Sequence, residues 1–369
     1  MDSRRRFLQT INKEIPDRPP IFATFTPQVA EKMSKHLGLP YEEPLDSMLS
    51  TRASHMDLLV ELGNDAVGIA ACAPDNFPTK TLVSGLIENE WGMIFKPMGL
   101  YNEFHIYPLA NAETADDILN YKFPDPLAKG RWTEAEKTIA KYGKTHGIIA
   151  DLETTLFETA WYLVGMEKFL MDLMMEAEYI NPLLDKIQEI HTVYGKKLIE
   201  LGADVLWCGD DFGTQQSQIM DMETFRKYFK PRIKDMFSEY KKVNPEVKLA
   251  WHSCGAFRPF IPEFIEIGLD IVNPLQPMAA GMEPELLKAD FGNDLTFFGG
   301  VCVQDLLPNK TPIEIKKEIN RRVNIFGEKG GYIVAPAHNV QDDTSIENIL
   351  AFFEAGKNPL NVIHKNEIT

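Results

Sequence analysis

Short hydrophobic runs alternate with longer amphipathic stretches along most of the chain. Each run is continuously apolar, which is the pattern of a strand buried on both faces of a parallel sheet. The eight runs are 20–25, 64–70, 146–152, 203–208, 247–253, 269–274, 295–300 and 331–336. Stretches that predict helices lie at 44–62, 130–144, 176–200, 221–243, 310–328 and 345–356. This alternation indicates an α/β protein.

Eight strands that alternate with helices are typical of a (β/α)8 TIM barrel. A doubly wound open sheet is the alternative, but no G-x-G-x-x-G sequence follows the first strand, so a dinucleotide-binding fold has little support. Residues 81–109 break the alternation and favour β-hairpins or a lid between the second and third strands. No repeat or linker divides the chain, so we expect one domain over residues 1–369 with an irregular insertion near 75–110.

Composition narrows the class of protein. The net charge of −16 argues against nucleic acid and anionic membranes as partners. No run reaches the roughly 18–20 apolar residues of a membrane helix, and residues 1–20 lack the apolar segment of a signal peptide. Four cysteines in 369 residues are too few for a disulfide framework, so we expect a cytoplasmic protein whose thiols are free or bind metal.

Polar residues gather where the predicted strands end, which is where barrel enzymes place their active sites. In chain order they are Asp151, Glu153, Glu158, Cys208, Asp210, Asp211, Gln215, His252, Cys254, Asn273, Gln276, Cys302, Gln304, His338, Asn339 and Gln341. Some have structural explanations, because acidic residues after a strand often cap helices and single cysteines are often small buried residues. Asp210 and Asp211 are adjacent, so only one can face the barrel axis, while the other faces or caps a helix.

The sequence "LAWHSCGAF" (249–257) places His252 and Cys254 two residues apart at the end of a strand. A period of two puts both side chains on one face of the strand. Imidazole and thiolate together are good zinc ligands, and His338 at the end of the last strand could join them if its loop leans inward. The alternative is that Cys254 is only a buried thiol.

At these residues the chain resembles the uroporphyrinogen decarboxylase superfamily, and within it the corrinoid-linked methyltransferase branch. That branch includes methylcobalamin:coenzyme M methyltransferases and O-demethylase methyltransferases. The resemblance covers most of the chain and is specific in combination. It is carried by "ENEWGMIFK", "ETAWYLVGMEKFLMDL", "DDFGTQ", "WHSCG" and "GGYIVAPAHNVQDDTSIENI". The family fold is a (β/α)8 barrel, in agreement with the strand count.

The resemblance also implies ligands. In the methyltransferases of this family zinc is held by an H-x-C pair and a later cysteine in an A-P-G-C-like context. His252 and Cys254 match the pair, whereas "APAH" puts His338 in place of the later cysteine. The true decarboxylases carry a histidine near this place that is not a ligand, and they bind substrate carboxylates with an arginine-rich amino-terminal motif. Here the first strand reads "IFATFTPQ", without arginine, which counts against uroporphyrinogen as the substrate.

These observations favour a zinc-dependent methyltransferase that moves a methyl group from a methoxylated, aromatic compound to the cobalt of a separate corrinoid protein. Zinc or an acid would stabilise the charge on the departing oxygen. Cobalamin is expected on a partner, because the chain has no D-x-H-x-x-G sequence. The expected residues are His252, Cys254 and His338 as ligands, Glu153 or Asp211 as fourth ligand or proton donor, and Gln215, Asn339, Phe212 and Trp161 around the substrate.

Two other classes of function stay open. One is a metal-free lyase of the decarboxylase type that uses Asp211 and His338 as acid and base. The other is a binder that kept the fold without the chemistry. The sequence leaves the oligomeric state and the direction of methyl transfer open.

Overall fold

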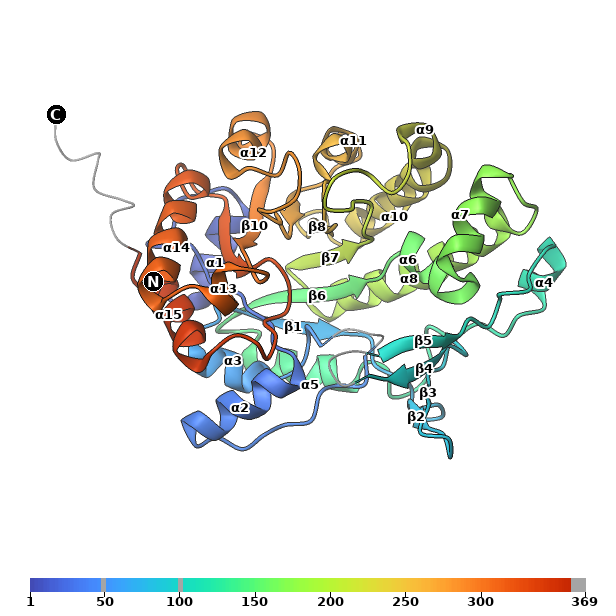
Figure 1. Ribbon diagram of the computed structural model, residues 1–369, viewed down its shortest axis with the longest axis horizontal. Helices are drawn as coiled ribbons and strands as arrows, with labels where there is room; N and C mark the ends of the chain where they lie inside the picture. Colours follow the sequence, from blue (N-terminus) through green and yellow to red (C-terminus); the bar gives the residue numbers. More distant parts are fainter. Residues whose placement is uncertain (48–50, 99–101, 360–369) are drawn as a thin grey trace.

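A curled parallel sheet forms the centre of the molecule, with helices around its outside (Figure 1). The computed structural model describes residues 1–47, 51–98 and 102–359. In spatial order the strands of this sheet are β1 (Ala66–Ala70), β6 (Gly147–Glu153), β7 (Val205–Gly209), β8 (Lys248–His252), β9 (Ile271–Asn273), β10 (Thr296–Val301) and β11 (Tyr332–Pro336). The spatial order follows the chain order and all pairs are parallel, so the α/β fold and seven of the eight predicted strands are confirmed.

Side chains alternate between two cores along each strand. One set, which includes Val205, Trp207 and Ala250, lies in an inner cluster enclosed by the curl of the sheet. The other set, which includes Leu206 and Trp251, packs in the larger cluster beneath the helices. Both faces are therefore apolar, which explains why these strands read as continuous hydrophobic runs.

The predicted first strand, residues 20–25, does not form a regular strand. It makes only isolated parallel bridges to the β11 side, from Ile21 to Val334 and from Phe25 to Val340. On its other side the carboxamide of Asn64 accepts from the backbone N–H of Ala23 (2.9 Å) and donates to its carbonyl (2.9 Å). A side chain thus takes the place of a strand partner, and the predicted eight-stranded barrel is confirmed only as a curled seven-stranded sheet.

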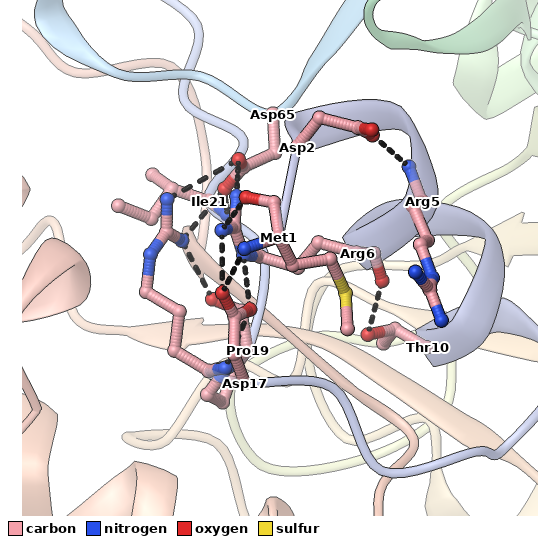
Figure 2. A network of polar contacts seen from close by, with 10 residues as sticks. Met1, Asp2, Arg5, Arg6, Thr10, Asp17, Pro19, Ile21 and Asp65 are labelled. Carbon is pink, nitrogen blue, oxygen red and sulfur yellow. Dashed lines mark hydrogen bonds and ion pairs between the residues drawn. The ribbon is translucent and has the colours of Figure 1, made fainter.

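Asp65 fixes this segment at the start of β1 (Figure 2). Its fully buried carboxylate accepts hydrogen bonds from Arg6 (2.7 Å), Arg18 (2.7 Å) and the backbone N–H of Ile21 (2.8 Å). Arg6 belongs to helix α1 (Ser3–Ile11) and also binds Asp17. One buried acid therefore joins α1, the 20–25 segment and β1, with both arginines compensating its charge.

The main outer helices are α2 (Pro27–Leu37), α3 (Met56–Leu62), α5 (Thr133–Tyr142), α8 (Ile180–Leu201), α10 (Lys230–Val243), α14 (Pro312–Phe326) and α15 (Ile346–Lys357). Shorter ones are α4 (Ala115–Leu119), α6 (Phe157–Val164), α7 (Met166–Met174), α9 (Met222–Thr224), α11 (Ile261–Glu266), α12 (Pro284–Phe291) and α13 (Leu306–Asn309), with a π-helical turn at Phe225–Phe229 and a 3-10 turn at Arg258–Phe260. Across the described ranges, no helix has the length and hydropathy needed to cross a bilayer.

The helix predicted at 44–62 is wrong over its first part. Residues 44–47 and 51–55 are not helical, and 48–50 lie outside the described residues. Helix α3 begins only at Met56, because His55 has a φ of 59°, which is left-handed and ends any regular helix.

The insertion between β1 and β6 forms a small antiparallel sheet of β2 (Lys80–Thr81), β3 (Ile87–Glu88), β4 (Ile94–Pro97) and β5 (Asn102–Ile106). The arrowheads of β1 and β6 point toward it in Figure 1. Phe104 of β5 packs against the rings of Tyr162 (4.7 Å between centroids) and Trp161 (5.5 Å) of α6. The predicted β-hairpins near 75–110 are confirmed, and they lie beside the carboxyl end of the parallel sheet.

Candidate metal centre and neighbouring cavity

Three side chains with metal-binding atoms converge at the carboxyl ends of β7 and β8. One ligand atom from each of Asp211, His252 and Cys254 lies within 4.8 Å of the others. Nε2 of His252 is 3.4 Å from Sγ of Cys254 and 3.6 Å from Oδ1 of Asp211. A nitrogen, a sulfur and a carboxylate oxygen thus face one small volume.

Asp210 and Asp211 have different roles, as their adjacency predicts. Asp210 is fully buried and accepts backbone N–H groups of Thr155 (3.1 Å) and Glu158 (3.0 Å), so it caps the start of α6. Asp211 turns to the opposite side, where its Oδ1 accepts the backbone N–H of Cys254 (2.7 Å). Asp210 therefore links the end of β7 to the loop after β6. Asp211 places its carboxylate beside His252 and Cys254.

Asn273 orients the ring of His252. Its Nδ1 lies 2.5 Å from Oδ1 of Asn273, and the amide nitrogen of Asn273 donates to the carbonyl of Phe298 (3.0 Å). That second bond sets which end of the amide faces the imidazole. Nδ1 therefore carries the proton, and the lone pair of Nε2 points toward Cys254 and Asp211.

Two glycines let the loops after β7 and β8 touch backbone to backbone. A Cβ on Gly255, whose φ is 79°, would lie 2.5 Å from the carbonyl of Gly213, and a Cβ on Gly213 would lie 2.6 Å from the backbone nitrogen of Ala256. Glycine at both positions brings Asp211 and Cys254 together.

A buried cation, Arg52, lies next to these residues. Its guanidinium stands 4.9 Å from the centre of the Trp207 ring, and it lines a narrow space together with His252 and His338. Burial, and after it the positive charge of Arg52, lower the pKa of His252 well below its usual value and that of His338 to about 4. Both imidazoles are therefore neutral near pH 7, which is the form that binds metals.

The thiol of Cys254 is half-buried, and its pKa is raised by burial and by the nearby carboxylate of Asp211. A bound cation would reverse this effect, because it favours the thiolate. The same carboxylate that disfavours an isolated thiolate is a ligand for that cation.

His338 stands outside the group of three. Its ring centre is 6.4 Å from that of His252, and its buried Nδ1 has no hydrogen-bond partner among the described residues. The side chain lines both the narrow space that contains His252 and a larger cavity next to it. His338 therefore separates the candidate metal centre from that cavity.

The cavity has a volume of about 540 Å³ and lies between the parallel sheet and the antiparallel insertion. Its apolar wall is aromatic and is formed by Trp91, Phe95, Phe104, Tyr162 and Tyr194. Polar groups on its surface include Glu90 and Arg131, which form an ion pair (2.6 and 2.7 Å). A volume of this size and lining is typical of a site for a small organic molecule.

The other residues expected at the site have varied positions. Asn339 lines the cavity and bonds to Thr24 and Thr51. Gln215 is exposed and donates to Gln276 (3.2 Å), and Trp161 is half-buried against the insertion. Phe212 is fully buried among core rings, so it belongs to the aromatic core and not to the cavity wall. Glu153 ends β6, and its side chain lies outside what the structure describes.

Sequence reasoning missed Arg52, Glu90 and Arg131. Arg52 falls in the wrongly predicted helix. One signal for its position was available, because a glycine inside a buried strand often marks close approach of another backbone. A Cβ on Gly68 of β1 would lie 2.3 Å from the carbonyl of Arg52.

The fold and these side chains define an α/β protein with a candidate Asp–His–Cys metal centre at the carboxyl end of its sheet. The uroporphyrinogen decarboxylase (URO-D) family model matches residues 108–359, and the chain belongs to this family.

Relatives within the family include both methyltransferases and decarboxylases. The chain is 25% identical over 209 residues to a methylated-thiol–coenzyme M methyltransferase of Methanosarcina mazei, covering 57% of this chain and 53% of that protein. It is 22% identical to the methylcobamide:CoM methyltransferase MtaA of Methanosarcina barkeri (52% and 53% covered) and 24% identical to a uroporphyrinogen decarboxylase of Pelodictyon phaeoclathratiforme (48% and 49%). The chain spans about half the length of these curated relatives.

A solved structure described as a methyltransferase from Methanosarcina mazei shares the fold. Its TM-score is 0.68 at 21% identity, and the match covers 97% of this chain and 98% of that one.

Proposed function

We propose that this protein is a zinc-dependent methyltransferase that moves a methyl group from a methoxylated aromatic compound to the cobalt of a separate corrinoid protein. The observation that carries the proposal is the convergence of Asp211, His252 and Cys254, with the ring of His252 held by Asn273. The similarity to two methyltransferases, one of methylated thiols and one of methylcobamide, agrees with methyl transfer.

The donor atoms fit zinc in type and spacing. Tetrahedral zinc with bonds of about 2.0–2.1 Å to nitrogen and about 2.3 Å to sulfur places neighbouring ligand atoms roughly 3.3–3.6 Å apart. The separations from Nε2 of His252 are 3.4 Å to Cys254 and 3.6 Å to Asp211. When bound, zinc would supply positive charge that stabilises the atom from which the methyl group departs.

The chain's own residues have separate tasks in this proposal. The aromatic cavity holds the methyl donor, and Asn339 orients it from the cavity wall. His338 lies between donor and metal centre, where it can bind the departing atom or complete the ligand set. Asp211 acts as a ligand, which leaves Glu153 as the expected proton donor. Cobalamin arrives on a partner protein that docks over the mouth of the sheet.

We take the 20–25 segment, which bridges to the β11 side, to act as the first strand of a complete (β/α)8 barrel. We also take residues 1–369 to form one domain that acts in the cytoplasm.

The test combines metal content with methyl transfer. Purified protein should contain about one zinc ion per chain and should methylate a reduced corrinoid protein when a methoxylated arene is supplied. Cys254→Ala should lose both properties and keep its fold. Cys208→Ala removes a fully buried thiol from the outer core and is the matched control. Methyl transfer at the wild-type rate by Cys254→Ala would favour the metal-free alternative with Asp211 and His338 as acid and base.

A further inference from the structure

The cavity beside the candidate metal centre has an unusual balance of charge. Among the described residues that line it, Arg131 is the one lysine or arginine, whereas Asp46 and Glu90 are acidic. Apart from His338, the remaining walls are aromatic, apolar or uncharged polar groups. Which ligands the cavity accepts therefore depends on whether Arg131 is available to an anion.

The two terminal nitrogens of Arg131 are not available, and its Nε, which has no partner among the described residues, is buried away from the cavity surface. Its side chain is 1% exposed, and the two terminal nitrogens, which carry four N–H groups, make four hydrogen bonds. Two go to the carboxylate of Glu90 (2.6 and 2.7 Å), one to the carbonyl of Cys72 (3.0 Å) and one to that of Asp125 (2.8 Å). The fork that would bind a carboxylate is already occupied by Glu90.

The acidic groups add a negative field. Asp46 is exposed at the rim, where its Oδ2 accepts the backbone N–H of Thr79 (2.9 Å). The charge of Asp46 also acts on Cys72 in the cavity wall. Burial raises the pKa of its thiol to about 12, with the charges of Glu134 and Asp46 adding to this and Arg131 opposing it. A ligand carboxylate against this wall would lose its hydration without gaining a free cation from the wall in return.

We propose that this cavity selects uncharged methoxylated arenes and discriminates against the same arenes when they carry a ring carboxylate. The inference rests on the proposed function in taking an arene as the methyl donor. The Glu90–Arg131 pair is then a specificity determinant, since it holds the one cation of the wall in a form that anions cannot use.

The test is equilibrium binding, which needs no catalysis. Isothermal titration calorimetry near pH 7.5 would compare 2-methoxyphenol with 4-hydroxy-3-methoxybenzoate, which differ by one carboxylate. The neutral ligand should bind at least about tenfold more tightly, because an unpaired carboxylate pays its desolvation cost.

Glu90→Gln keeps the size of the side chain and releases the charge of Arg131. The affinity ratio should then move at least about tenfold toward the benzoate, because the guanidinium gains a free place for a carboxylate. Glu103→Gln removes the same charge from exposed β5, outside the cavity wall, and should leave the ratio unchanged. Asp46→Asn, at the rim, should move the affinity ratio in the same direction by a few-fold. This variant takes the place of Glu90→Gln in the test if Glu90→Gln does not fold.

Equal or tighter binding of the benzoate by the wild-type protein would overturn the inference. So would failure of both ligands to bind, or an unchanged ratio in both Glu90→Gln and Asp46→Asn. Methyl transfer is measured separately with the reduced corrinoid protein. Selective binding without turnover would leave the inference standing and contradict the proposed reaction.

Discussion

The side-chain oxygen of Asn273 lies 2.5 Å from Nδ1 of His252, and the two residues are direct partners in the β8–β9 pairing. Asn273 in turn donates to the carbonyl of Phe298 on β10. Three consecutive strands therefore determine the direction of one imidazole. The direction of its Nε2 atom is therefore set by the sheet.

Loss of this support should weaken metal binding without unfolding the protein. In Asn273→Ala the ring of His252 can rotate and change its tautomer, so zinc affinity should fall by about 10–100-fold. Competition with a chelator measures the affinity, and circular dichroism checks the fold. An unchanged zinc affinity would show that the orientation of His252 does not depend on Asn273.

The group of Asp211, His252 and Cys254 predicts how substitutions at Asp211 and His338 affect zinc binding. Asp211→Asn should lower zinc affinity more than His338→Ala, because the oxygen of Asp211 is within reach of both other ligand atoms and His338 stands outside the group. His338→Ala should mainly slow methyl transfer, and His338→Cys should retain zinc. Metal content and transfer rate are measured in parallel. The reverse order for zinc would make His338 the third ligand.

His191 on α8 predicts a stability effect that depends on pH. It is 2% exposed, neither ring nitrogen has a partner among the described residues, and burial lowers its pKa to about 3. The unfolded chain takes up a proton near pH 6.5, whereas the folded chain does not until about pH 3. Stability is therefore lost as the pH falls through that window and is unaffected above it.

Substitution of His191 by phenylalanine should remove this loss. The new ring can still pack against Trp91, whose ring is 6.1 Å from that of His191. The free energy of unfolding of His191→Phe minus that of the wild type should grow by about 1.4 kcal/mol for each pH unit by which the pH falls between roughly pH 6 and 4.5. Urea denaturation measures both values. His36→Phe, at an exposed position of α2, is the control and should follow the wild-type curve. Parallel curves for wild type and His191→Phe would contradict the argument.

The sequence predicts most of the fold because strands buried on both faces read as continuous apolar runs. Seven strands lie where these runs place them. The run at 20–25 has the same local pattern, and what interrupts its ladder is the distant side chain of Asn64, which no local pattern contains. The helix predicted at 44–62 fails over its first part because the backbone of His55 is left-handed, which the hydrophobic pattern does not indicate.

The candidate site is predictable only where strand geometry sets it. A period of two places His252 and Cys254 on one face and turns Asp210 away from Asp211, as the structure has them. Loop positions are different. Arg52, Glu90 and Arg131 reach the site through tertiary contacts between segments far apart in the chain, and nothing in their local sequence indicates this.

The antiparallel insertion has a consequence for how this fold can change. It contributes Trp91, Phe95 and Phe104 to the cavity, whereas Asp211, His252 and Cys254 come from other segments and do not line it. The part of the cavity wall that the insertion forms and the metal-binding residues therefore lie on separate stretches of the chain. Exchange of residues 80–106 for another hairpin segment can redirect the protein to a different small molecule while the metal ligands stay in place, so new specificities can arise without rebuilding the reactive centre.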